Sequence, residues 1–362
     1  GITVAQDTTL FEELMSSAQQ YYRPGEAWFK FASLYNTEFG GKRRELAIKY
    51  TFNSAEQGFL RGKLTLLKIR ASEADAEDSG EAKDIENEVK TLAEKGLTEA
   101  QVIYSQLLFR RYEQGSEQWT RAQHWIELAS EKGHPVANFL RGVAFEYGYF
   151  GTKDFFEAYR YYNDAALNYH ADSQLKIGYF NGIGRVVEKN KALAILWYSL
   201  CAKSDNLECI RNLAINHMEG TVEEPNYELA RFLFKYAADK GHISSKTSLG
   251  VMYLYGKGID VDYPLANKLF EQACTGKDGE ACQYLATSYQ KGKGVEIDLS
   301  VANQLYTKSC DLNNYGGCLG LAIMYEVGDG VEINTSKAKS YFKRACQLGS
   351  NISCHKANGL LN

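Results

Sequence analysis

Eight cysteines are the side chains best suited to chemistry in this sequence, and they fall into four pairs. In every pair the second cysteine follows the first by eight positions, and no cysteine is left over. The pairs are Cys201/Cys209, Cys274/Cys282, Cys310/Cys318 and Cys346/Cys354. A tight turn between two helices would bring each pair within the roughly 4–7 Å Cα separation that a disulfide tolerates. Free buried thiols and zinc ligation remain alternatives, although zinc sites generally use closer cysteine spacing.

The remaining reactive side chains form no catalytic set that we recognise. His134, His170 and His242 recur at corresponding positions before a helix, which indicates a structural role. Ser340 and Lys343 match the Ser-x-x-Lys pattern of penicillin-binding enzymes, but the Lys-Thr-Gly and Ser-Asp-Asn partners of that pattern are missing. The sequence also lacks a nucleophile elbow, a His-Glu-x-x-His motif and a Walker loop. We therefore expect a protein that is not an enzyme and that uses no cofactor and no catalytic metal.

The elements that position the cysteines repeat along the chain. A small residue recurs in steps of 36, and a large residue follows it three positions later in each copy. The small residues are Ala122, Ala158, Ala194, Ala230, Ala266, Ala302 and Ala338. Glycines at 184, 220, 258, 294 and 330 form a second marker, with steps of 36, 38, 36 and 36. Two degenerate copies, around Ala47 and Glu86, bring the array to nine units.

One unit reads as a helical hairpin. Residues 242–255 have the apolar spacing of a helix, Gly256 and Gly258 interrupt it, and Pro264 suits the start of a second helix. A single hairpin cannot bury its apolar face, so we predict an all-α superhelical solenoid of stacked hairpins. The predicted boundaries are an N-terminal capping helix in 1–24, the repeats in 25–350 and a C-terminal capping helix in 351–362.

An acidic stretch within residues 73–88 replaces the glycine turn of the second unit. Two interpretations remain open for it, a solvated loop or helix start and a contact for a basic partner or a cation. Its spacing does not match a calcium-binding loop.

Tyrosine is abundant, with 25 copies, and separates into two groups. Tyr253, Tyr289 and Tyr325 recur every 36 residues, which is typical of core positions. Aromatic residues outside that register are better candidates for contact with a partner, because tyrosine is enriched at protein interfaces. These candidates are Tyr147, Tyr149, Phe150, Tyr159, Tyr162, Tyr169 and Tyr255.

The composition limits the classes of partner and the cellular compartments that we expect. A net charge of −4, with 41 basic and 45 acidic residues, argues against nucleic-acid binding, and no apolar run is long enough to span a membrane. Four disulfides would imply an oxidising compartment, the periplasm or the extracellular space. The sequence starts at Gly1 without a signal peptide, as we expect of a processed or trimmed chain.

The motifs Ala-x-x-Leu-Phe-x-x-Ala and Tyr-x-x-Gly-x-Gly at this period resemble the Sel1-like repeat family, relatives of tetratricopeptide solenoids. Residues 241–258, which begin with Gly241-His242 and end with Gly256-Lys257-Gly258, carry the resemblance most clearly. The cysteine pairs are similar to those of the cysteine-rich Helicobacter proteins of this family. The resemblance implies disulfides between the second helix of one unit and the first helix of the next.

The resemblance also implies a function in protein binding. Exported bacterial relatives include envelope assembly scaffolds, host-interaction factors and immunity proteins that block secreted phospholipase-type toxins. We therefore expect an exported protein-interaction module, with the periplasmic immunity protein as its most concrete form. The alternatives are an envelope scaffold or host-interaction factor and, third, an enzyme acting on cell-wall peptides or β-lactams.

Overall fold

The structure is a computed structural model, and it describes residues 26, 32, 44–56, 60–73, 80–222 and 224–359. These residues form 18 helices and no strand, which confirms the all-α prediction. Residues 1–24, where we predicted an N-terminal capping helix, lie outside the described residues, and so does part of the acidic stretch, at 74–79.

The helices belong to two compact units, Gly1–Ser173 and Gln174–Asn362, and α10 (Ala171–Ile183) contains the boundary between them. The helices of the first unit are α3 (Arg44–Glu56), α4 (Leu60–Glu73), α5 (Gly80–Glu94), α6 (Thr98–Arg111), α7 (Glu117–Glu131), α8 (Pro135–Tyr147) and α9 (Phe155–Leu167). After α10 the second unit contains α11 (Lys191–Ala202), α12 (Leu207–Glu219), α13 (Tyr227–Asp239), α14 (Ile243–Tyr255), α15 (Tyr263–Thr275), α16 (Gly279–Lys291), α17 (Leu299–Asp311), α18 (Tyr315–Val327), α19 (Thr335–Gln347) and α20 (Asn351–Gly359).

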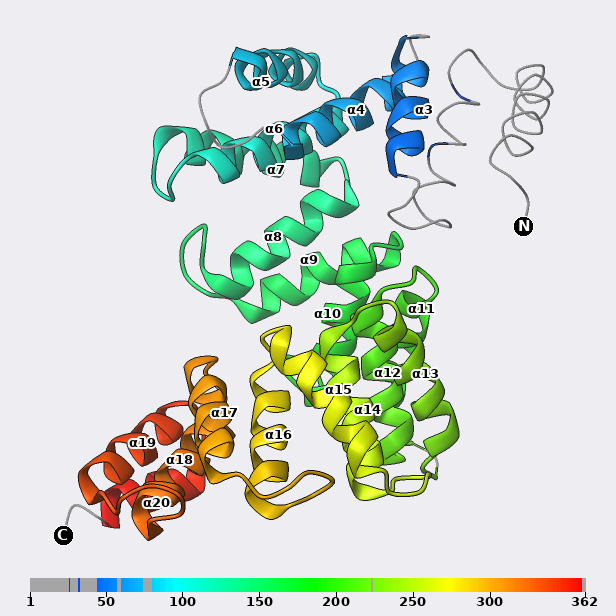
Figure 1. The fold of residues 1–362 in the computed structure, drawn as a ribbon. Helices are drawn as coiled ribbons and strands as arrows, with labels where there is room; N and C mark the ends of the chain where they lie inside the picture. The colour runs from blue at the N-terminus through cyan, green and yellow to red at the C-terminus, as the bar shows by residue number, and fades with distance from the viewer. Residues whose placement is uncertain are drawn as a thin grey trace. The chain divides into compact units, whose positions relative to one another are not determined.

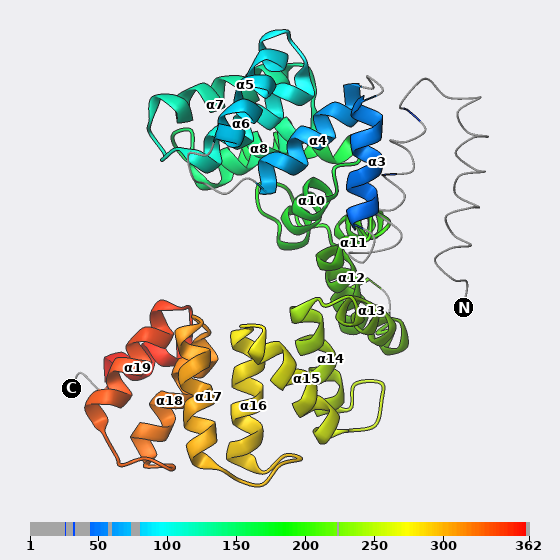
Figure 2. The same cartoon turned by 45° about the horizontal axis from the view of Figure 1, so that its top comes forward.

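Within each unit, consecutive helices pack as hairpins (Figure 1; Figure 2). The hairpin of α14 and α15 shows why the chain turns where it does. α14 ends at Gly256, whose φ of +64° is a left-handed conformation that glycine adopts without strain. α15 begins after Asp262, whose side chain accepts a hydrogen bond from the Leu265 backbone N–H at 2.9 Å. Pro264 lies in the first turn of α15, as predicted.

The same two caps recur at every turn between the first and second helix of a repeat from α8 to α19, which fixes where these helices end and begin. Glycines with positive φ follow the first helix at 148, 184, 220, 256, 292 and 328, always 36 residues apart. Asp or Asn residues cap the second helix at 154, 190, 226, 262, 298 and 334, again 36 apart.

This register explains the step of 38 in the glycine pattern of the sequence. Gly184 and Gly220 end a first helix, whereas Gly258, Gly294 and Gly330 are the second glycine of the turn. A Cβ atom at Gly258 would lie 2.1 Å from Cβ of Tyr227, the first residue of α13. The second glycine therefore allows the turn of one repeat to approach the repeat before it.

The recurring alanines lie at the helix contacts, as predicted, and all seven are buried. The large residue three positions after each alanine is only partly buried, however. The fully packed side chain is the fourth residue after the alanine, namely Ile126, Tyr162, Tyr198, Phe234, Phe270, Tyr306 and Phe342. Phe270 illustrates the packing, because a Cβ atom at Gly250 of α14 would lie 2.6 Å from its ring. A small residue on the first helix thus accommodates a ring from the second.

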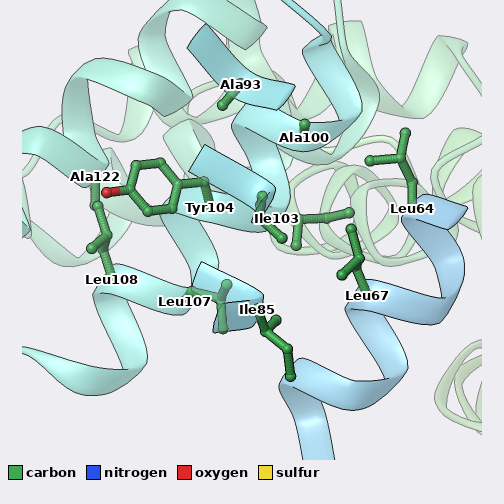
Figure 3. Packing of buried hydrophobic residues seen from close by; sticks show 11 residues of the cluster. Leu64, Leu67, Ile85, Ala93, Ala100, Ile103, Tyr104, Leu107, Leu108 and Ala122 are labelled. Carbon is green, nitrogen blue, oxygen red and sulfur yellow. The ribbon is translucent and has the colours of Figure 1, made fainter. Parts of the chain in front are cut away.

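The degenerate repeats of the first unit build a core from four helices. Leu64 and Leu67 of α4, Ile85 of α5 and Ile103 and Leu107 of α6 face one another, as Figure 3 shows. Ala122 of α7 closes the same cluster. This part of the array therefore packs by the same principle without any cysteine.

Candidate functional site

Four disulfides hold the second unit, and their pairing is the one predicted. Cys201–Cys209, Cys274–Cys282, Cys310–Cys318 and Cys346–Cys354 have Cα separations of 5.9, 4.7, 4.6 and 4.6 Å. Each bridge joins the end of a second helix to the start of the next first helix. All eight cysteines lie in these bridges, which supports the disulfides over the alternatives of free thiols and zinc ligation. Each bridge covalently links one repeat to the next.

The turn between α13 and α14 has no cysteines, and a polar cluster holds it instead. The His242 ring bonds to the Ser245 hydroxyl at 2.8 Å and to the Glu208 carboxylate of α12 at 2.8 Å. The hydrogen bond from His242 lowers the pKa of Glu208, although burial of this carboxyl opposes the shift. Nearby, Asp205 bonds to Lys240 and to the Tyr236 hydroxyl.

The other two turn histidines are also engaged, which supports their predicted structural role. His134 bonds to Glu99 of α6 at 2.8 Å. His170 lies against the ring of Phe139, with centroids 4.7 Å apart, and its Nδ1 accepts a hydrogen bond from the Ser173 backbone N–H. Burial lowers the pKa of His170.

The first candidate surface lies in the first unit, around the turn between α8 and α9. Tyr147 and Tyr149 are 49% and 44% exposed, and their rings stack with centroids 5.6 Å apart. Phe150 stacks on Phe109 of α6, with ring centroids 6.0 Å apart. Tyr159 is half-buried on α9. Tyr169, at the other end of α9, is 85% exposed.

Tyr162 does not belong to this surface. Its side chain is fully buried, and its hydroxyl donates a 2.6 Å hydrogen bond to the Glu146 carboxylate. Burial, with the neighbouring Glu146, raises the pKa of Tyr162 well above the ordinary value. The sequence held the signal for this position, because residues 162, 198, 234, 270, 306 and 342 are all aromatic and 36 apart.

A charged hollow lies toward the C-terminal end of α9, near Leu167 and Asn168. Arg141 and Arg160 both lie over the Tyr161 ring, at 4.7 and 4.2 Å from its centroid. The hollow has a volume of about 390 Å³, and Asp164 and Leu167 also line it. Leu167 and Phe156 are strongly exposed as well, and neither was among the predicted contact residues.

The second candidate surface lies in the second unit and includes Tyr255, which is 55% exposed. Tyr255 is the last residue of α14, and the last residues of α10, α12, α16 and α18 are exposed too. We call these five residues the helix-end row: Ile183, Glu219, Tyr255, Lys291 and Val327. They are spaced 36 residues apart, a signal that the sequence analysis missed because the row mixes apolar and charged types.

The structure also places the serine and lysine of the Ser-x-x-Lys pattern. Ser340 and Lys343 lie exposed on α19, within a regular helix. Over the residues that the structure describes, no group of three His, Cys, Asp or Glu side chains has the arrangement of a metal site. None of the described helices has the length and hydrophobicity needed to cross a lipid bilayer.

Comparison with known proteins places these features in a family. A family model described as Sel1 repeat matches seven segments of the chain, at residues 112–134, 135–170, 171–206, 207–242, 244–278, 279–314 and 317–350. A search of curated protein sequences finds no match.

Two solved structures agree with this chain in fold, and a third is similar over one part of it. A protective antigen of uropathogenic Escherichia coli with an SLR fold is 24% identical over 76% of this chain, with a TM-score of 0.58. The chain spans 59% of the length of that protein. A Sel1 repeat protein from Oxalobacter formigenes is also 24% identical, over 68% of this chain and 96% of its own, with a TM-score of 0.61. The cysteine-rich protein B of Helicobacter pylori is 30% identical over 34% of this chain and 95% of its own, with a TM-score of 0.30.

Proposed function

Because this chain belongs to the Sel1 repeat family, we propose that it is a non-enzymatic module that binds another protein outside the cytosol. The observation that carries the proposal is the set of exposed aromatic side chains on well-capped helices. Tyr147, Tyr149, Tyr169 and Tyr255 have 44–85% of their surface open to solvent. Tyrosine contributes large contact area with few rotatable bonds, so exposed tyrosines on a rigid scaffold favour binding.

The disulfides support the proposal of a rigid binding surface and that of a location outside the cytosol. Bridges that close short loops restrict the unfolded chain, and a pre-organised surface loses less entropy on binding. Disulfides persist in oxidising compartments and are rare in the cytosol. We therefore place the protein in the periplasm or outside the cell.

The finer form of the proposal concerns the partner. An exported module without chemistry of its own can act by covering the active site of another protein. We propose a secreted toxin of the phospholipase type as that partner, which makes this chain an immunity protein.

Calorimetry tests both levels of the proposal. The oxidised chain is titrated with the products of neighbouring genes, toxin candidates included. We expect a saturable complex, weakened about tenfold or more by Tyr149→Ala or Tyr255→Ala, whichever lies in the interface. Ile352→Ala, an exposed apolar change on α20, serves as the control and should leave the affinity unchanged.

One outcome would contradict only the immunity role, and another would contradict the non-enzymatic function. A complex with a partner that is not a toxin removes the immunity form and keeps the binding module. Turnover of a labelled β-lactam or cell-wall peptide that Ser340→Ala abolishes would overturn the non-enzymatic proposal itself.

A further inference from the structure

The helix-end row has an ordered chemistry along the second unit. Starting from α10, its members are aliphatic, acidic, aromatic, basic and aliphatic, in the order Ile183, Glu219, Tyr255, Lys291 and Val327. Each side chain is exposed, and each is the last residue of a first helix. α16 and α18 pack directly on each other, and equivalent residues follow one another in a stack of repeats, so the row runs along successive first helices.

Both ends of the line are widened by apolar side chains. Tyr179 lies one helical turn before Ile183, and Ile323 lies one turn before Val327. Both are exposed, at 43% and 39%. The ends of the row are therefore broad apolar patches, whereas its centre is the single ring of Tyr255.

The two charges of the row are available for a partner. Among the described residues, neither Glu219 nor Lys291 forms an ion pair or a side-chain hydrogen bond, although ion pairs are common elsewhere on the described helices. Lys293 lies 5.9 Å from the centre of the Tyr255 ring and adds positive charge on the Lys291 side. The row is thus negative on one side of Tyr255 and positive on the other.

We propose that the helix-end row binds an extended segment of a partner protein with the complementary order apolar, basic, apolar, acidic, apolar. This inference rests on the proposed function and names the kind of segment recognised. Packed helices lie about 8–10 Å apart, and an extended chain advances roughly 3.3 Å per residue. The matching side chains should therefore recur about every third residue, in a segment of about 13 residues.

The order of the charges distinguishes this segment from peptides that bind non-specifically through apolar side chains. A basic side chain pairs with Glu219, an acidic one with Lys291, and an apolar one packs on Tyr255. Placing like charges opposite one another is unfavourable, so the row should reject segments with two basic or two acidic residues at these places.

The test uses three fluorescent peptides of about 13 residues on a serine background. All three carry leucine at both ends and tryptophan at the centre. Between these anchors, the first peptide carries one lysine and one glutamate, the second carries two lysines and the third carries two glutamates. Fluorescence anisotropy is followed up to millimolar concentrations of the oxidised chain. We expect the lysine–glutamate peptide to bind about threefold or more tightly than the other two, with a preference that weakens at high salt.

Charge exchange then separates recognition from folding. Glu219→Lys should weaken the lysine–glutamate peptide about fivefold and strengthen the two-glutamate peptide, a gain that a merely damaged fold cannot give. Tyr255→Ala should weaken all three peptides about tenfold. Glu296→Lys, the same charge change at an exposed site outside the row, is the matched control and should change nothing.

Failure of this inference can be distinguished from failure of the proposed function. Equal binding of the three peptides, or no saturable binding of any, overturns the inference about the row. A partner protein whose affinity is unchanged by Glu219→Lys and Tyr255→Ala also overturns it, while the binding module itself stands.

Discussion

At the scale of single residues, three buried rings, Tyr162, Phe270 and Tyr306, match the side chain 16 positions before them in polarity. Tyr162 donates to Glu146 at 2.6 Å, and Tyr306 donates to Gln290 at 2.9 Å. Where the ring is Phe270, the corresponding residue is Leu254, in the same apolar cluster. In these three pairs the hydroxyl occurs where the neighbouring helix provides an acceptor, since an unpaired buried hydroxyl is costly.

This match predicts the effect of adding a hydroxyl. Phe270→Tyr should destabilise the second unit by about 1–3 kcal/mol, because the new hydroxyl faces Leu254 without an acceptor. Guanidinium unfolding followed by circular dichroism measures the loss. The control is Phe270→Tyr combined with Leu254→Gln, which restores the arrangement of Tyr306 and should recover part of the stability. A single variant as stable as the parent would contradict the argument.

His170 predicts a dependence of stability on pH. Burial lowers its pKa, Asp172 opposes that shift, and His134 adds to it. The unfolded chain therefore binds a proton more readily than the folded chain, so folding favours the neutral ring. The contribution is complete above the ordinary pKa of about 6.5 and is lost as the pH falls below it. Protonation also removes the acceptor for the Ser173 N–H.

The measurement compares the wild type with His170→Asn between about pH 8 and pH 5. We expect the wild type to lose more stability than the variant over this interval, because only the wild type has the buried imidazole. Asparagine keeps a short polar side chain before α10, where it can still cap the helix. Parallel stability curves for the two proteins would show that His170 does not titrate differently on folding.

At the scale of elements, the four bridges differ in their exposure to reductant. Cys274–Cys282 and Cys310–Cys318 are buried, as is Cys201–Cys209, whereas Cys346 and Cys354 are half-buried at the end of the array. Thiol–disulfide exchange requires access to a sulfur atom. Brief reduction followed by alkylation should therefore label Cys346 and Cys354 first, as peptide mass spectrometry will detect. Equal labelling of all eight cysteines would mean that global opening, and not access, sets the rate.

The helices and turns also show how much of the fold can be predicted from the sequence. The period of 36, the hairpin, the bridges and the alanine contacts followed from the positions of Ala266, Gly256 and Cys274 and their equivalents, because repetition marks equivalent environments. The fully buried position was missed because the third and fourth residues after the alanine are both large, although the fourth is aromatic in six of the seven copies and the third in only four. Tyr162 was misplaced for this reason. Exposure of Glu219 and Lys291 could not be predicted, because it depends on the ends of neighbouring helices.

At the scale of the whole molecule, the two units reach stability by different routes. All eight cysteines lie in the second unit, whereas the first unit depends on packing such as the cluster around Leu64 and Ile103. In repeat arrays each repeat contacts only its neighbours, so a local loss of stability stays local over a few repeats. Reduction should therefore affect one unit far more than the other.

Hydrogen exchange with and without reductant measures this asymmetry along the chain. Each bridge closes a loop so short that the chain-entropy estimate gives about 2.5 kcal/mol, so reduction of all four removes most of what typically stabilises a domain. We expect amides of α11–α20 to lose protection after reduction, while those of α4–α8 keep theirs. The quadruple variant Cys201→Ala, Cys274→Ala, Cys310→Ala and Cys346→Ala should behave like the reduced protein without any reductant. Full protection of the second unit after reduction would remove the reason for folding in an oxidising compartment, and with it the argument for export.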